Sequence, residues 1–233
     1  MPASLIENLL QFQPYFHSVV PYEPAADKLL PLDFTAANKE LTIDVLEDIH
    51  RFSFYINKKL AEADARYGVG GYAEHRTVYQ VSSVFDGKNP GEEPRRFHLG
   101  VDIWGPAGTP VMAPLEGTVH SFAFNDRYGD YGATIILSHT LQHLTFFTLY
   151  GHLSKSSIEH ISEGDLITAG HTFASFGMPE ENGHWPPHLH FQVIADIEGW
   201  SGDYPGVCRF SKKEKYMANC PDPNLILQYD CLG

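Results

Sequence analysis

The sequence predicts a mainly β protein, in which an antiparallel β-sandwich or barrel-like core follows an N-terminal helical extension. From residue 76 onward, short β-type runs alternate with clusters of Gly, Pro, Asn and Asp. No long helical pattern interrupts these runs. Before them, residues 37–67 carry apolar side chains at three- and four-residue spacing, which is the period of one helix face.

We divide the 233 residues into an N-terminal extension (1–95), a core (96–199) and an irregular C-terminal tail (200–233). Prolines interrupt residues 1–36, which favours an extended segment over the surface, because proline lacks an N–H for regular pairing. One long helix is predicted over 37–67, with Gly68 as its cap. We expect it to pack on the core or beside a cleft through Leu41, Val45, Ile49, Phe52 and Ile56.

The β-type runs of the core follow one another closely. Turn residues between closely spaced strands are typical of an antiparallel sandwich or barrel. The runs are RTVYQVSSVF, GTPVMAP, GTVHSFAF, ATIILSH, LTFFTLYGHL, DLITAG and HLHFQVI.

Composition and charge exclude several classes of partner. Hydrophobic residues make up 43% of the chain and charged residues 19%, which is enough apolar material for a sizeable core. The formal net charge of -13 argues against nucleic acid and anionic membranes as partners, because Lys and Arg supply most of that affinity. No run reaches the roughly 18 apolar residues that a membrane-spanning helix needs.

The N-terminus and the cysteines predict a cytoplasmic location. The opening residues MPASLIENLLQFQPYF lack the basic and continuous apolar regions of a signal peptide. Cys208, Cys220 and Cys231 have no CxxC spacing and are expected to be reduced thiols. A leaderless export route stays open.

Among the 13 histidines, the segment HLGVDIW stands out because His98 and Asp102 are four residues apart. On a straight strand they would lie about 13 Å apart, at about 3.3 Å per residue. Two ligands of one ion need bonds of about 2 Å, so the segment must be helical or bend. Gly100 favours a bend, although such a pair alone also arises by chance.

The segment HLHF is the second candidate, since a strand would place His188 and His190 on one face as neighbours. His152, in LYGHLS, is a third candidate, although alone it could be structural. Two histidines and one carboxylate would leave the fourth position of a zinc ion to water, whose pKa the ion lowers towards about 7. Further imidazoles could then orient that water or move its proton.

The other histidines are expected to be surface residues or core residues with satisfied partners. His184 is undecided, because it lies close to the HLHF segment in the sequence. The remaining ones are His17, His50, His75, His120, His139, His143, His160 and His171.

At these residues the sequence resembles the lysostaphin-type zinc metallopeptidases, the LytM-domain endopeptidases that cut peptidoglycan. The resemblance covers about residues 96–195, in order through HLGVDIWGPAGTPVMAPLEGTV, DYGATIILSH, TLYGHLS, ISEGDLITAGHTFASFG and PPHLHFQV. It implies a core of the duplicated hybrid motif type that binds Zn²⁺. By this resemblance, His98, Asp102 and His190 look like the zinc ligands, and His152 and His188 like the catalytic histidines.

The chain departs from the family's pattern before HLHF. The stretch GMPEENGHWPP is bulkier and more acidic than the short Gly-, Ser- and Thr-rich loop that is usual there. Such a loop would border the cleft, so the physiological substrate stays open. The oligomeric state and the role of residues 1–95 stay open as well.

Two other functions compete with hydrolysis. A catalytically silent metal-binding or partner-binding scaffold would be expected to have lost ligands, whereas all five positions are present. The segments APLEGTV and EGDLITAGHTFASFG echo lipoyl- and biotinyl-type carriers, but neither contains the lysine that such a carrier modifies. We therefore predict a zinc metalloendopeptidase, or a related amidohydrolase, acting on a peptidoglycan-type peptide or another small peptide or amide.

Overall fold

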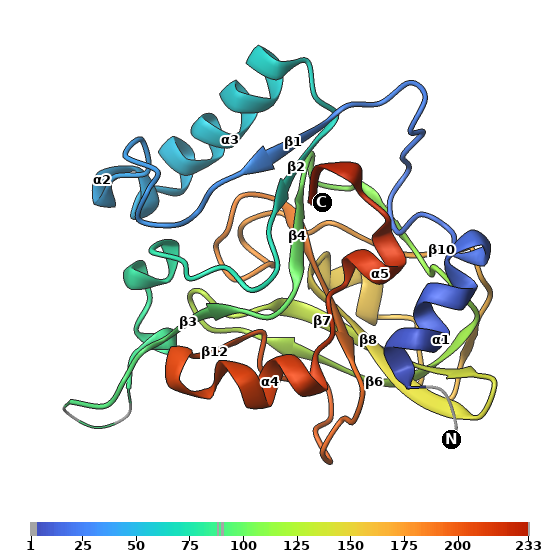
Figure 1. Ribbon diagram of the computed structural model, residues 1–233. Helices are drawn as coiled ribbons and strands as arrows, with labels where there is room; N and C mark the ends of the chain where they lie inside the picture. The colour runs from blue at the N-terminus through green and yellow to red at the C-terminus, as the bar shows by residue number, and fades with distance from the viewer. Residues whose placement is uncertain (1–3, 88, 90, 233) are drawn as a thin grey trace.

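The computed structural model describes residues 4–87, 89 and 91–232, which form a mainly β protein with few helices (Figure 1). One large sheet has the strand order β1-β2-β4-β11-β8-β7-β6-β9. Two smaller sheets pair β10 with β5 and β12 with β3. The predicted mainly β fold class is therefore confirmed.

The elements have the following bounds. The strands are β1 (Leu29–Leu32), β2 (Tyr67–Gly70), β3 (Arg95–His98), β4 (Val101–Trp104), β5 (Pro110–Met112), β6 (Gly117–Asn125), β7 (Gly132–Leu141), β8 (Leu144–Leu153), β9 (Leu166–Ile167), β10 (Thr172–Ser175), β11 (His188–Ile194) and β12 (Val207–Arg209). The α-helices are α1 (Leu5–Phe12), α2 (Ile43–Leu46), α3 (Ile49–Ala63), α4 (Lys213–Asn219) and α5 (Asn224–Leu227).

The centre of the large sheet is the strand β11, which pairs antiparallel with β4 on one side and β8 on the other. All seven of its residues are buried, so the strand is covered on both faces. The antiparallel expectation holds for the core strands. The sheet as a whole is mixed, because β1 of the extension pairs parallel with β2.

The helix predicted over 37–67 is shorter and interrupted. α2 and α3 are separated where the Asp48 side chain accepts hydrogen bonds from the backbone N–H groups of His50 and Arg51, which caps α3. α3 ends at Asp64 in a left-handed conformation. Gly68 is therefore not the helix cap. It lies in β2 instead, where it pairs with Trp104 of β4.

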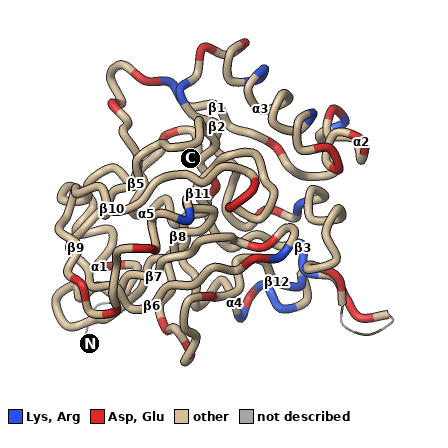
Figure 2. Tube along the Cα trace, turned by 180° about the vertical axis from the view of Figure 1, so that it is seen from behind, with Lys and Arg blue, Asp and Glu red and all other residues tan. Residues whose placement is uncertain are grey.

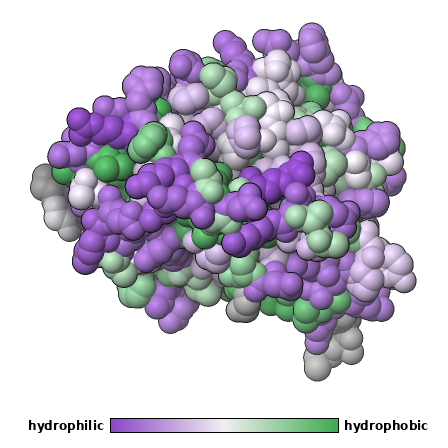
Figure 3. All heavy atoms as spheres, turned by 90° about the horizontal axis from the view of Figure 1, so that it is seen from above, coloured by the Kyte–Doolittle hydropathy of each residue, from purple (hydrophilic) through white to green (hydrophobic). Residues whose placement is uncertain are grey.

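The buried face of α3 packs towards the core. Its buried residues are Phe52, Ile56 and Leu60, and the ring of Phe52 lies 5.8 Å from that of Trp104 in β4. The outer face carries polar residues, and the surface on this side is largely hydrophilic with scattered apolar side chains (Figure 3). The extension thus joins the core at β4, both through this helix and through β2.

The two ends of the chain contain more regular structure than predicted. α1 begins at a capping box in which the Ser4 side chain and the Glu7 side chain each accept a backbone N–H of the other residue. The tail forms β12, α4 and α5, and it contacts the first segment where Gln13 donates to the carbonyl of Leu225. None of the described helices combines the length and apolarity needed to cross a membrane.

Candidate active site

The chain reverses between β3 and β4, and this turn brings His98 and Asp102 together. His98 ends β3 and Asp102 lies in β4, so their Nε2 and Oδ1 atoms are 3.3 Å apart. The predicted bend at Gly100 is present. A Cβ on Gly100 would lie 2.5 Å from Cε1 of His190, so the absence of a side chain allows the close approach of that ring.

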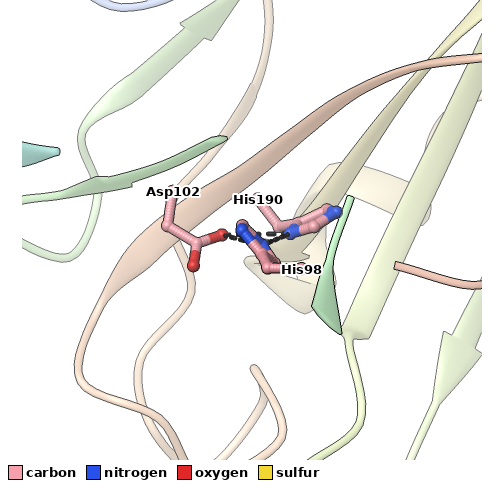
Figure 4. Close-up of side chains that lie close together, drawn as sticks. All are labelled: His98, Asp102 and His190. Atoms are coloured by element: carbon pink, nitrogen blue, oxygen red, sulfur yellow. Dashed lines mark hydrogen bonds and ion pairs between the residues drawn. The ribbon is translucent and has the colours of Figure 1, made fainter. Parts of the chain in front are cut away.

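His190 completes a triangle of possible ligand atoms, because β11 places it directly opposite Asp102. Its Nδ1 atom lies 3.0 Å from Nε2 of His98 and 3.0 Å from Oδ1 of Asp102. All three side chains are buried. Figure 4 shows them pointing toward one another from separate segments of the chain.

The size and chemistry of this triangle fit a metal ion. Bonds of about 2 Å in a tetrahedral site place neighbouring ligand atoms about 3.3 Å apart. Two imidazole nitrogens and one carboxylate oxygen form a donor set that transition metals accept. The group of His98, Asp102 and His190 could therefore hold a metal ion.

The second polar atom of each side chain is also held. His98 donates from Nδ1 to the carbonyl of Gly71 at 3.0 Å, and His190 donates from Nε2 to Oε1 of Gln192 at 2.9 Å. Oδ2 of Asp102 accepts a hydrogen bond from Arg76. These contacts direct His98 Nε2, His190 Nδ1 and Asp102 Oδ1 to the centre of the triangle.

The environment favours the unprotonated ligand forms. Burial lowers the pKa of His98 to about 4, and the charge of Arg76 acts in the same direction. Burial by itself raises the pKa of Asp102, but His98 and Arg76 hold it well below its usual range. A carboxylate and a neutral imidazole are the forms that bind metal ions.

His152 and His188 lie next to this triangle. Their rings are 4.1 Å apart, and the ring of His152 is 6.4 Å from that of His190. His152 donates from Nδ1 to the carbonyl of Asn182, and His188 donates from Nδ1 to the carbonyl of Pro186. The Nε2 atom of each ring therefore carries a lone pair. Burial is the main reason that the pKa of His188 falls to about 4 and that of His152 well below its usual value.

The backbone of His152 explains how its ring reaches this position. His152 has a φ of 61°, in the left-handed region that non-glycine residues rarely adopt. The register between β7 and β8 shifts at this point, because Ala133 pairs with Leu153 while Ile135 pairs with Tyr150. The extra residue forms a bulge in β8, a feature that often re-aims a side chain beside an active site.

A cavity of about 600 Å³ lies beside the site. It is lined by Asp102, His152, His188 and His190, but not by His98. Its walls come from the extension (residues 78–87), from the core and from the tail (residues 203–207). Arg95, Arg127 and Arg209 also line it, and basic residues are visible around β3 and β12 (Figure 2).

Sequence reasoning missed two residues at the site and left one undecided. The Trp104 ring stacks on His188 at 3.9 Å, and Arg76 contacts Asp102. Trp104 ends the HLGVDIW segment but was given no role there, and Arg76 lies outside the segments that carry the candidate residues. His184, the undecided residue, is exposed and stacks on Tyr128, outside the triangle.

Two histidines and a carboxylate gathered in a β core, with further imidazoles beside them, are an arrangement that metal-dependent hydrolases use. Residues 96–201 match the profile described as Peptidase family M23. The match takes in less than half of the chain, which is therefore similar to that family over its core.

Several curated relatives are similar to this chain. The chain is 34% identical over 130 residues to an uncharacterized metalloprotease of Haemophilus influenzae, which covers 52% of this chain and 24% of the relative. It is 33% identical over 129 residues to the DD-carboxypeptidase/endopeptidase Mpg of Neisseria meningitidis, and that alignment covers 53% of this chain and 26% of the relative. It is 29% identical over 147 residues to the L-Ala--D-Glu endopeptidase of Bacillus subtilis, and that alignment covers 60% of this chain and 43% of the relative.

The chain thus spans about a quarter of the length of the first two relatives. Among solved structures, the catalytic domain of lysostaphin from Staphylococcus simulans has a TM-score of 0.41 at 22% identity. That match covers 76% of this chain and 98% of the lysostaphin domain.

Proposed function

We propose that this protein is a zinc-dependent endopeptidase that hydrolyses an amide bond in a peptidoglycan-type peptide or another small peptide. The observation that carries the proposal is the convergence of the possible ligands His98, Asp102 and His190 with two further histidines at one cavity. The activities in the names of the Neisseria and Bacillus relatives support the substrate class.

His98, Asp102 and His190 would hold the zinc ion, which supplies Lewis acid catalysis and acidifies water at its open position. His188 and His152 act at Nε2, where each holds a lone pair because Nδ1 donates to a backbone carbonyl. One of them accepts the proton of the attacking water, and either can return it to the leaving amine. Their neutral state near pH 7 follows from their burial.

The cavity walls indicate how a substrate would be held. A volume of about 600 Å³ is within the usual range of small-ligand sites and suits a short peptide segment. The lining carries Arg95 and Arg127 as well as Asp130 and Asp203. Charged groups of either sign on a peptide would therefore meet opposite charges.

A catalytically silent scaffold is the second candidate, and the site does not favour it. A scaffold that binds a partner has no need for two buried imidazoles whose free nitrogens adjoin a possible metal triad. Burying such polar groups costs free energy unless they are bonded or used.

Hydrolysis of a peptide panel by the purified full chain tests the proposal. The panel contains pentaglycine and muropeptides, and products are identified by mass spectrometry. We expect turnover that a chelator abolishes and that added zinc restores. Zinc-loaded protein that cleaves no member of the panel would favour the scaffold.

A further inference from the structure

Arg76 is a buried cation in the extension, outside the residues that match the family profile. Its side chain is 1% exposed and packs over the ring of Phe34 at 5.1 Å. It follows β2 at the start of the RTVYQVSSVF run, outside the segments that carry the candidate site residues. A guanidinium buried to this degree needs anions and acceptors around it.

The contacts of Arg76 fix its orientation on several sides. Nε donates to Oε2 of Glu74 at 2.7 Å, and Nη2 donates to the carbonyl of Gly71 at 3.2 Å. Nη1 donates to Oδ2 of Asp102 and lies 3.3 Å from the Tyr79 hydroxyl. The planar fork therefore spans from Glu74 to Asp102 and can turn very little.

Two of the three possible metal ligands depend on this loop. Because Arg76 occupies Oδ2 of Asp102, only Oδ1 faces the imidazole nitrogens of His98 and His190. The Gly71 carbonyl, which accepts from Arg76, also accepts from Nδ1 of His98. One short stretch of the extension thus orients both ligands.

We propose that Arg76 is a positioning residue of the metal centre, whose fork holds Asp102 with one oxygen directed at the ion. The loop from Gly71 to Arg76 is then part of the site, and the family core alone lacks it. The inference rests on the proposed function only in requiring that the triad binds zinc. Substituting such supporting groups typically weakens metal binding by about 10- to 100-fold.

The test compares zinc affinity in the full chain of Arg76→Lys and Arg76→Met with that of wild type. Lysine keeps the charge but cannot span two carboxylates with a planar fork. The matched control is Arg66→Lys, since Arg66 also belongs to the extension and pairs with Asp27 at 3.0 Å away from the site. Zinc dissociation constants come from competition with a chromophoric chelator, without any substrate.

We expect zinc binding about 10-fold weaker or worse in Arg76→Lys, weaker still in Arg76→Met, and within about twofold of wild type in Arg66→Lys. Thermal unfolding with and without zinc separates positioning from a merely structural role. A positioning role reduces the rise in Tm that zinc produces, because that rise follows the affinity. If Arg76→Met does not fold, Arg76→Lys decides the question.

The proposal would be overturned if Arg76→Lys bound zinc with wild-type affinity and its Tm fell equally in the zinc-free and zinc-loaded forms. A wild-type protein that binds no zinc at the triad would instead refute the proposed function. The two failures are therefore distinguishable.

Discussion

His139 and His188 are both buried in the large sheet, yet their rings have different partners. His139 donates from Nδ1 to the carbonyl of Glu116 at 2.9 Å, and its Nε2 is 2.7 Å from the Thr148 hydroxyl. His188 donates from Nδ1 to the carbonyl of Pro186, and its Nε2 has no hydrogen-bond partner within the described part of the chain. Burial lowers the pKa of each to about 4.

Neither burial nor pKa distinguishes His139 from His188. The second ring nitrogen does, because Nε2 of His139 is bonded and Nε2 of His188 has no hydrogen-bond partner in the described part of the chain. His139 is satisfied at both nitrogens and serves the packing between β7 and β8. His152 resembles His188, because among the described residues only its Nδ1 has a hydrogen-bond partner, and both rings line the cavity.

The largest effect is expected from His190→Ala, which removes one of the three proposed protein ligands. Two remaining ligands bind zinc weakly, so we expect the protein to lose its zinc and all zinc-dependent activity. Zinc content by atomic absorption measures this. His139→Gln is the matched control and should keep one zinc per chain. Full zinc occupancy in His190→Ala would show that the ligand assignment is wrong.

His152→Ala should separate metal binding from catalysis. The substitution leaves the triad intact, so zinc content should stay at the wild-type level. The rate of peptide hydrolysis should fall by about two to four powers of ten, which is typical for loss of a general acid–base group. Unchanged turnover would remove His152 from the mechanism and leave His188 as the proton carrier.

Gly100→Ala should weaken zinc binding, because it would crowd the ring of His190. A Cβ at this position would lie 2.6 Å from Nε2 of His190 and 2.8 Å from the carbonyl oxygen of Phe191, so the ring must shift. We expect zinc affinity to fall by about 10-fold or more. Arg66→Lys is the control, because Arg66 pairs with Asp27 away from the site. Equal affinities in the two variants would contradict the close-approach explanation.

The smallest effect concerns His139 and pH. Its folded-state pKa of about 4 lies below the ordinary value of 6.5, so the unfolded chain binds a proton more readily. His139 should therefore destabilise the fold as pH falls from 6.5 towards 4, by about 2 kcal/mol between pH 7 and pH 5. Denaturant unfolding of zinc-free wild type and His139→Gln measures this. Parallel pH profiles would contradict it.

The sequence predicted the β core well, because its strands depend on local patterns. Period-two alternation in HLHFQVI identifies β11, and it predicts that His188 and His190 share a face. Which histidine binds a metal and which moves a proton came from the resemblance alone. Those roles, the three-part division of the chain and the cytoplasmic location remain predictions.

What the sequence could not predict depends on contacts between distant segments. Apolar periodicity runs through 41–60, but the side chain of Asp48 caps a new helix and divides the segment. Arg76 joins the site only because β2 pairs with β4, which carries Asp102. The capping box at Ser4 and Glu7 was readable in the sequence, and it would have indicated α1.

The most direct test of the account is an anomalous difference map, recorded at the zinc edge from crystals of the zinc-loaded protein. We predict one peak, bonded at about 2.0–2.2 Å to Nε2 of His98, Oδ1 of Asp102 and Nδ1 of His190. His152 and His188 should lie beside it without a bond to the ion. A peak bonded to Nε2 of His152 or His188, or no peak at the triad, would contradict the account.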